Sequence, residues 1–188
     1  MEYERYSDVE LLSRIIGAKE AHRLYEGKLA PLFKARQYRG RALEKLGAAY
    51  ELVKRSLLEE LRRDCTMTSP DQVKNYLRAA VGSLEYESFR CLFLDTQHRL
   101  IAAEELSRGT IAAAAVYPRE VMKRALAHNA AAIIFCHNHP SQTAEPSEGD
   151  RALTKTLQQA LSLVDIRTLD HFVIGGANVT SFAERGWL

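Results

Sequence analysis

Cysteine is scarce in this chain, and its spacing excludes a disulfide framework. Three cysteines are present, Cys65, Cys91 and Cys136, and no two of them form a C-x-x-C pair. An odd number of cysteines at wide spacing is not typical of a small domain held together by disulfides. This usage is typical of a reducing compartment, so we expect a cytoplasmic protein.

The sequence also lacks long apolar runs and an excess of charge of one sign. No run of about 18 or more apolar residues is present, so no membrane span is expected. The first residues, MEYERYSDVELL, do not place a basic segment before an apolar core, and no secretory signal is expected there. The 26 Lys and Arg residues nearly balance the 24 Asp and Glu residues, which gives no strong electrostatic case for nucleic acid as a partner.

Helical patterns fill the first part of the chain. Ser7 followed by Glu10 has the spacing of a capping box, and apolar residues recur at helical spacing after it. A second helix is predicted over about residues 41–63, and a third begins with Pro70 at its first position. We therefore expect a small N-terminal helical region over residues 1–65.

From residue 87 onward the pattern changes to strands that alternate with helices. The stretches ESFRCLFLD and RLIAAEEL, separated by a turn, predict a β-hairpin. AAIIFCH is a nearly continuous apolar run, typical of a buried strand, and IRTLDHFVIGG and NVTSFAE predict two more strands. PREVMKRALAHNA and SEGDRALTKTLQQALSLV predict helices. Together they predict a mixed α/β fold, which we assign to a domain of residues 66–188.

The stretch FCHNHPSQTAEPSEGD, residues 135–150, gathers polar side chains at the end of the predicted buried strand. His137 and His139 are two residues apart, so at a strand end they point to the same face and can converge on one ion. Asp150 lies eleven residues beyond His139, in the first turn of the next predicted helix. Two histidines and one aspartate suit zinc, with a fourth position left to water.

A purely structural explanation fits the same residues. Ser147 and Asp150 have the spacing of a capping box, so Ser147 would cap the helix and Asp150 would complement its dipole. His137 and His139 would then be ordinary loop residues. The H-x-H spacing alone leaves the metal site and the capped loop as open alternatives.

The complete motif resembles the JAMM motif of the MPN+ (JAB) metalloproteases, which is H-x-H, seven residues, S, two residues, D. This chain has His137-x-His139, seven residues, Ser147, two residues and Asp150. The resemblance implies a cytidine-deaminase-like α/β domain, with a curved mixed sheet between helices. Flanking stretches narrow it to the RadC-like branch: VYPREVMKRALAHNAAAIIFCHNHPS, TLDHFVIGGANVTSFAERGWL, ESFRCLFLDTQHRLI and, near the start, YSDVELLSRIIG.

The resemblance also implies a role for each motif residue. His137, His139 and Asp150 match the positions of the zinc ligands in the family. Ser147 matches the serine whose hydroxyl helps to stabilise the tetrahedral intermediate. The cofactor implied is therefore Zn²⁺.

Residues outside the motif receive roles from the same resemblance. The family needs an upstream glutamate as general base, and Glu87, at the start of the first core strand, matches it. Glu85, two residues earlier, is the alternative. Cys136 is expected to face away from the site and to pack in the core, because neighbouring residues of a strand point to opposite faces. His171 in LDHFVIGG matches a family position and is expected to pack or hydrogen-bond near the site.

Two features depart from the family pattern. Gln142 stands where RadC-like proteins usually have glycine, which readily adopts φ > 0, so we expect the loop to bend differently or to close over the site. RadC-like chains also carry a helix-hairpin-helix segment that binds DNA phosphates, but KLAPLFKARQYRGRALEKLG has no G-x-G hairpin. Residues 1–65 are therefore predicted to be a degenerate version, with at most a weak DNA contact. Its basic stretch, Lys34–Arg41, is interpreted as a solvated turn.

The function that these residues predict is a zinc-dependent hydrolase of peptide or isopeptide bonds, in which a metal-activated water attacks the carbonyl with Glu87 as general base. The expected partner is a peptide or protein substrate, and no association with a membrane is expected. One alternative is a DNA-repair or mobile-element accessory protein that binds DNA, with little or no hydrolase activity. Another is a non-catalytic scaffold, although scaffold members of the superfamily typically lose ligands and this chain keeps the full set.

Overall fold

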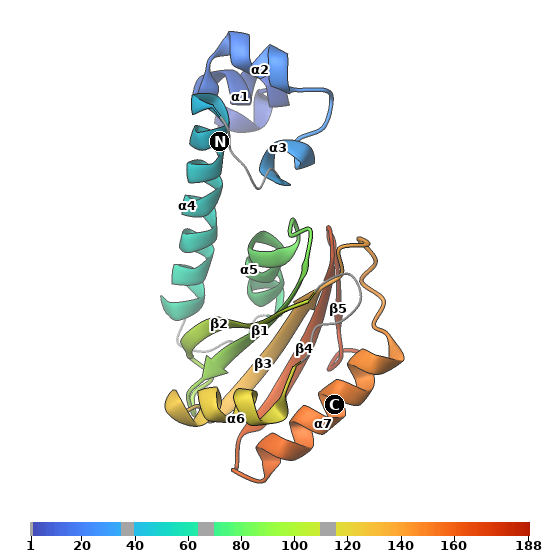
Figure 1. The fold of residues 1–188 in the computed structure, drawn as a ribbon. Coiled ribbons are helices and arrows are strands. Elements are labelled where there is room, and N and C mark those ends of the chain that lie inside the picture. The colour runs from blue at the N-terminus through green and yellow to red at the C-terminus, as the bar shows by residue number, and fades with distance from the viewer. Residues whose placement is uncertain (1, 35–39, 64–69, 110–115) are drawn as a thin grey trace. The chain divides into compact units, whose positions relative to one another are not determined.

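The structure is a computed structural model that describes residues 2–34, 40–63, 70–109 and 116–188 (Figure 1). The chain divides into two compact units, Met1–Ser56 and Leu57–Leu188, which we call the first and the second unit. The predicted domain boundary after residue 65 falls outside the described residues and stays a prediction. No helix in the described part of the chain is both long enough and apolar enough to cross a membrane.

The first unit is helical, as predicted, but it holds more helices than the sequence patterns indicated. The capping box before α1 forms: the Glu10 carboxylate accepts a hydrogen bond from the Ser7 backbone N–H (2.7 Å), and Ser7 Oγ accepts one from the Glu10 N–H (3.4 Å). The small apolar core of this unit consists of Leu12, Ile16, Ala21, Leu32 and Leu46. The elements are η1 (Glu2–Arg5), α1 (Asp8–Ile16), α2 (Ala18–Leu24), α3 (Ala30–Lys34) and the first part of α4 (Arg41–Arg63).

The second unit contains a five-stranded mixed sheet in the order β2-β1-β3-β4-β5. β3 and β4 are parallel, and the other neighbouring pairs are antiparallel. The predicted hairpin is β1 and β2, and the predicted buried strand is β3, in which all seven residues are buried. The bounds are β1 (Glu87–Leu94), β2 (Leu100–Gly109), β3 (Ala132–Asn138), β4 (Arg167–Gly175) and β5 (Asn178–Ser181).

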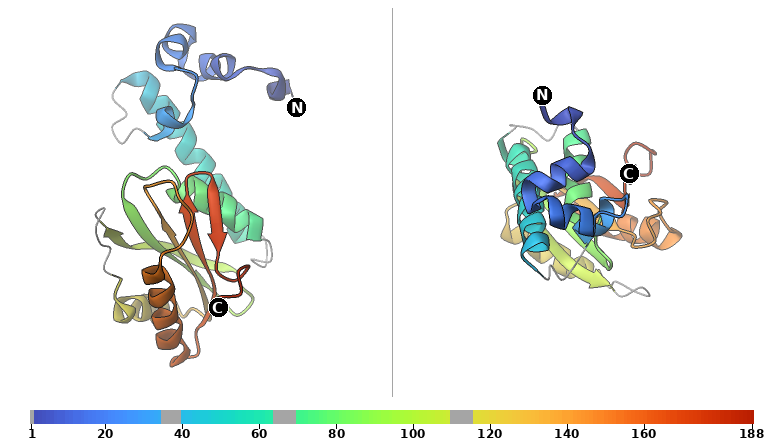
Figure 2. Two further views of the ribbon diagram at one scale, coloured as in Figure 1. Left: turned by 90° about the vertical axis from the view of Figure 1, so that its right-hand side faces the viewer. Right: turned by 90° about the horizontal axis from the view of Figure 1, so that it is seen from above.

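Helices cover both faces of this sheet (Figures 1 and 2). α5 (Pro70–Val81) packs on one face, and α6 (Pro118–Ala127) and α7 (Glu148–Ser162) pack on the other. Both α5 and α6 begin at a proline, as predicted, because the fixed φ of proline suits the first helical position. The mixed α/β class with a sheet between helices is confirmed.

The alternation of side chains along β3 decides which residues reach the site. Ile133 and Phe135 belong to the apolar cluster beneath α6 and α7, whereas Ile134 and Cys136 belong to the cluster beneath α5. Since the period of a strand is two residues, His137 points to the α7 side. Cys136 points away from the site, and burial raises its pKa to about 12, so its thiol stays neutral. The prediction that Cys136 is a core residue is confirmed.

Candidate metal centre

Two histidines meet at the carboxyl end of β3. His137 is the sixth residue of that strand and its side chain is 2% exposed, while His139 follows directly after the strand and is 19% exposed. His139 is held there by its backbone N–H, which donates to the carbonyl of Ile174 in β4 (2.8 Å). The two Nε2 atoms lie 3.0 Å apart, so the imidazoles converge as the spacing predicted.

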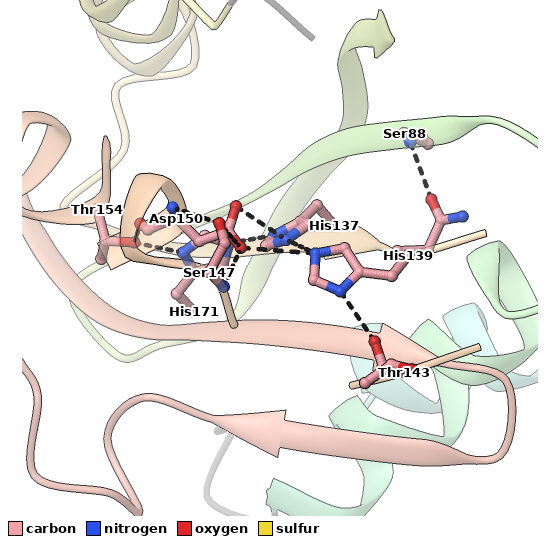
Figure 3. A network of polar contacts seen from close by, with 9 residues as sticks. Ser88, His137, His139, Thr143, Ser147, Asp150, Thr154 and His171 are labelled. Carbon is pink, nitrogen blue, oxygen red and sulfur yellow. Dashed lines mark hydrogen bonds and ion pairs between the residues drawn. The ribbon is translucent and has the colours of Figure 1, made fainter. Parts of the chain in front are cut away.

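Asp150 comes to the same point from the first turn of α7. Ser147 is the N-cap: its Oγ accepts a hydrogen bond from the Asp150 N–H (3.1 Å), and the Asp150 carboxylate accepts from both the N–H and the hydroxyl of Ser147 (2.7 Å each). The same carboxylate lies 3.3 Å from His137 Nε2 and 3.5 Å from His139 Nε2 (Figure 3). The capping box and the histidine cluster therefore exist together, and the cap fixes where the carboxylate points.

The donor atoms of this cluster fit one zinc ion. A tetrahedral zinc site with bonds of about 2.0–2.1 Å keeps its ligand atoms about 3.3–3.4 Å apart. The two Nε2 atoms lie 3.0 Å apart, Asp150 Oδ1 lies 3.3 Å from His137 Nε2, and Asp150 Oδ2 lies 3.5 Å from His139 Nε2. With one atom taken from each residue, the ligand atoms of His137, His139 and Asp150 all lie within 4.8 Å of one another. Two nitrogens and one oxygen are also ligand types that zinc accepts. These three residues would hold the metal and leave its fourth position open.

The hydrogen bond of His139 Nδ1 determines which ring nitrogen of His139 carries the proton. His139 Nδ1 lies 2.8 Å from the carbonyl oxygen of Thr143. Because a carbonyl only accepts hydrogen bonds, Nδ1 carries a proton and donates it. In the neutral ring Nε2 is then free of a proton and faces the cluster, which is the form that a metal binds.

Charges in the cluster are set by burial and by these contacts. Burial alone would raise the pKa of Asp150, but hydrogen bonds with His137 and His139 outweigh it and hold the pKa well below its usual range. The hydrogen bond with Asp150 raises the pKa of His139, although burial opposes it, and the charge of Glu87 adds a smaller contribution of the same sign. Burial lowers the pKa of His171 well below its ordinary value. Asp150 is thus ionised, and His171 neutral, at neutral pH.

Comparison with known proteins agrees with this geometry. Residues 67–187 match the family described as the RadC-like JAB domain. The chain belongs to this family. It is 54% identical over 159 residues to the UPF0758 protein of Chromobacterium violaceum, covering 84% of this chain and 71% of that protein. It is 56% identical over 143 residues to the UPF0758 protein of a Janthinobacterium species, covering 76% of this chain and 64% of that protein.

The match confirms the RadC-like branch that the motif and its flanks indicated. The chain spans about two thirds of the length of these relatives, and their printed names state no activity. The RadC-like JAB domain accounts for the fold and for the His-His-Asp cluster. The family match does not identify the reaction, the substrate or the partners of the chain.

The glutamate matched to the general base begins a strand that neighbours β3, the strand that carries His137. Glu87 is the first residue of β1, and Phe89, two residues on and on the same face, pairs with His137 across the β1–β3 ladder. Extending this antiparallel register by two residues places Glu87 opposite His139. Its charge acts on His139, as the pKa of that residue shows. Glu85 precedes the strand and is exposed.

Two sequence expectations about the loop of residues 140–146 can be compared with the structure. Gln142 adopts φ = 69°, so the left-handed conformation expected of the usual glycine is retained by a larger residue. The turn closes with a hydrogen bond from the Gln142 N–H to the carbonyl of His139 (3.0 Å). Ser147, the predicted oxyanion donor, gives its hydroxyl proton to Asp150 in this structure. That role therefore needs the hydroxyl to turn away from Asp150.

The expectation that His171 packs or hydrogen-bonds near the site is confirmed. Thr143 and Thr154 also contribute contacts, which the sequence analysis did not indicate. Thr143 contributes its backbone carbonyl, which every residue type has, so the sequence cannot indicate it. Thr154 hydrogen-bonds to His171, and His171 to His137, from inside the core (Figure 3). The spacing could have indicated Thr154, because it lies four residues after Asp150 and so on the same face of α7.

Proposed function

We propose that this protein is a zinc-dependent hydrolase of peptide or isopeptide bonds. The observation that carries the proposal is the convergence of two imidazole nitrogens 3.0 Å apart with one carboxylate, whose two oxygens lie 3.3 and 3.5 Å from them, a set that suits a tetrahedral ion with one open position. His137, His139 and Asp150 would hold the zinc. When bound with an open position, zinc polarises a substrate carbonyl and lowers the pKa of a bound water to about 7.

Access to the site supports a reaction with an external substrate. The side chain of His137 is 2% exposed and closes the inner side, whereas Asp150 and His139 are 15% and 19% exposed. A substrate carbonyl would therefore approach from the side of His139 and Asp150. Two observations support a place for Glu87 and Ser147 on that side: the β1–β3 register, extended beyond Phe89 and His137, brings Glu87 opposite His139, and Ser147, the N-cap of α7, hydrogen-bonds to Asp150.

Glu87 would act as general base and then as general acid. Its carboxylate would take a proton from the attacking water as the new C–O bond forms at the carbonyl carbon. It would then deliver that proton to the amine nitrogen as the C–N bond breaks, which balances the hydrolysis. The partial burial of Glu87 and its charge interaction with His139 support this position.

Ser147 would donate a hydrogen bond to the carbonyl oxygen as negative charge develops on it. Its hydroxyl now donates to Asp150 Oδ2 (2.7 Å), so it lies within reach of the ligand cluster. If a metal binds Asp150, the negative charge of the carboxylate would depend less on the hydrogen bond from the Ser147 hydroxyl. The hydroxyl can then turn toward the oxyanion, an interaction worth most in the transition state.

The test is cleavage of a peptide library and of an isopeptide-linked conjugate by zinc-loaded protein. The proposal predicts cleavage that a chelator removes and zinc restores, with none in the Asp150→Ala variant. Glu148→Ala is the matched control, because Glu148 is an exposed acid in the same helical turn. A protein loaded with zinc but inert toward both substrate classes would contradict the proposal.

The DNA-associated accessory protein remains a prediction without a supporting contact among the described residues. The net charge of the chain is only +2, and residues 35–39 of the basic stretch Lys34–Arg41 lie outside the description. Binding to duplex DNA that weakens steeply with added salt would favour it. No retention of DNA at low salt would remove it.

A further inference from the structure

A chain of short contacts leads from α7 through the core to the inner zinc ligand. Thr154 Oγ1 lies 2.6 Å from the carbonyl oxygen of Asp150 and 2.6 Å from His171 Nδ1. His171 Nε2 in turn lies 2.8 Å from His137 Nδ1 (Figure 3). Thr154 and His171 are 2% and 0% exposed, so no solvent competes for these groups. Every polar atom along this path therefore depends on its neighbour for a hydrogen bond.

The direction of these hydrogen bonds follows from the chemistry of the groups. A carbonyl only accepts, and a hydroxyl has a single proton, so Thr154 gives that proton to the Asp150 carbonyl. Thr154 Oγ1 must then accept from His171 Nδ1, which carries the ring proton. In the reverse arrangement, lone pairs of Thr154 Oγ1 and the Asp150 carbonyl would face each other at 2.6 Å.

The same argument continues to His137. With its proton on Nδ1, a neutral His171 has a bare Nε2 that accepts from His137 Nδ1 at 2.8 Å. In the neutral ring the single proton of His137 is then on Nδ1, and Nε2, which faces His139 and Asp150, is left to bind a metal. That is the tautomer that a metal requires.

We propose that Thr154 and His171 form a positioning relay that fixes the tautomer and ring orientation of His137 for zinc. The inference rests on the proposed zinc site and goes beyond it, because neither residue touches the metal position. Both residues act through His137. The relay prepares the inner ligand before any metal arrives.

The surroundings of the relay hold its two members in place. Thr154 is one helical turn after Asp150, so α7 carries a zinc ligand and the start of the relay on one face. The ring of His171 stacks on Phe182 (4.8 Å between centroids) and meets Phe135 edge-on (5.8 Å). These apolar contacts define the ring plane but leave its proton to Thr154.

The first experiment compares zinc affinity by competition with a chromogenic chelator. Thr154→Val keeps the shape of the side chain and removes the hydroxyl, and we expect it to bind zinc about 10- to 100-fold more weakly. Thr154→Ser, which restores the hydroxyl, should bind within about threefold of wild type by the same principle. Thr156→Val is the matched control, because Thr156 is an exposed threonine of α7 whose hydroxyl donates to the Ala152 carbonyl in the same way and is not part of the relay. Circular dichroism of each variant verifies the fold.

The second experiment reads the tautomers directly, by two-bond ¹H–¹⁵N correlation spectra of the histidine rings. In metal-free protein, the relay predicts a proton on Nδ1 and a bare Nε2 in His171, and Thr154→Val should disturb this pattern while Thr154→Ser preserves it. Zinc affinity of Thr154→Val equal to wild type, or a proton on Nε2 of His171, would overturn the relay. Because the spectrum needs no metal, a wild type that fails to bind zinc would refute the zinc site while the relay is still decided.

Discussion

The Asp150 carboxylate shows how one side chain serves two purposes. As the third residue of α7 it accepts hydrogen bonds from the N–H and the hydroxyl of Ser147, which is a capping box. Both of these hydrogen bonds go to Oδ2, which also lies 3.5 Å from His139 Nε2, while Oδ1 lies 3.3 Å from His137 Nε2. From the sequence, the cap and the metal site were alternatives. In the structure the cap determines the direction of the carboxylate, so the same side chain completes the capping box and faces the two imidazoles.

Glu87 carries the clearest prediction at this scale. Glu87→Gln removes the proton acceptor but no zinc ligand, so we expect zinc content to stay at the wild-type level while the rate of hydrolysis falls by about 10²- to 10⁴-fold. Elemental analysis and a peptide-cleavage assay measure the two effects separately. The control is Glu85→Gln, because Glu85 is exposed and precedes the strand. If Glu87→Gln cleaves as fast as wild type, another group is the base.

The site could be predicted from the sequence as far as its chemistry lies in rare side chains at fixed spacing. A purely structural role is less expected when His137, His139 and Asp150 occur together at this spacing. At a strand end, residues i and i+2 point to one face, which brings the two imidazoles together. The contacts that place their protons could not be predicted. Thr143 acts through its backbone, and Thr154 has a common side chain whose role depends on which core residue lies opposite.

At the scale of elements, the loop of residues 140–146 lies tightly against the turn between β4 and β5. A Cβ atom on Gly175 would lie 2.3 Å from the Ala144 nitrogen and 2.4 Å from the Thr143 carbonyl carbon, both backbone atoms. A Cβ on Gly176 would lie 2.4 Å from Oε1 of Gln142. Because Gly175 and Gly176 carry no side chains, the loop approaches close enough for the Thr143 carbonyl to reach His139.

Gly175→Ala tests this docking. The added methyl group must displace the backbone of the loop, so we expect the Thr143–His139 hydrogen bond to be lost and zinc affinity to fall by about tenfold or more. Gly149→Ala is the control, because its Cβ would meet only Ser147 Oγ at 3.5 Å, an ordinary contact. It should keep zinc affinity and add about 0.4–1 kcal/mol to the free energy of unfolding. Equal zinc affinity in Gly175→Ala would show that the loop position does not matter.

The elements themselves were predictable where the local signals were strong. Proline at the first position marked α5 and α6, and the long apolar stripe marked α4 over its observed range of Arg41–Arg63. α2 and α3 have seven and five residues, and Ala21 is the only residue of α2 recorded as buried. Such short helices depend on packing against neighbours rather than on their own residue pattern, so the pattern alone does not predict them.

At the scale of the whole molecule, charge pairing links stability to pH. Burial alone would raise the pKa of Glu105, but hydrogen bonds from Arg108 and Ser88 outweigh it and lower the pKa. Every carboxyl group with a shifted pKa in the described residues is shifted in the same direction. These groups are Glu10, Glu20, Glu51, Asp95, Glu104, Glu105, Glu145 and Asp150.

The sign of this shift predicts acid sensitivity. A carboxyl group with a lowered pKa in the folded state stabilises the fold above its unfolded pKa, near 4.5 for glutamate, and loses that contribution as pH falls through the folded value. At pH values below about 4.5 we expect the Tm of the metal-free protein to decrease, by about 2–4 °C for each kcal/mol of folding free energy that is lost. Thermal melts from pH 7 to pH 3 measure it. Glu105→Gln should lower the Tm at pH 7 and flatten the acid slope, and an unchanged slope would contradict this assignment.

We propose that the end of β3 and the start of α7 form one zinc site. Its most direct test is zinc per chain, by elemental analysis, for wild type, Asp150→Ala and Glu148→Ala purified side by side. The account predicts about one zinc in wild type and in Glu148→Ala, and none in Asp150→Ala. Wild type without zinc after reconstitution, or full zinc content in Asp150→Ala, would mean that His137, His139 and Asp150 are only a capped loop beside a strand.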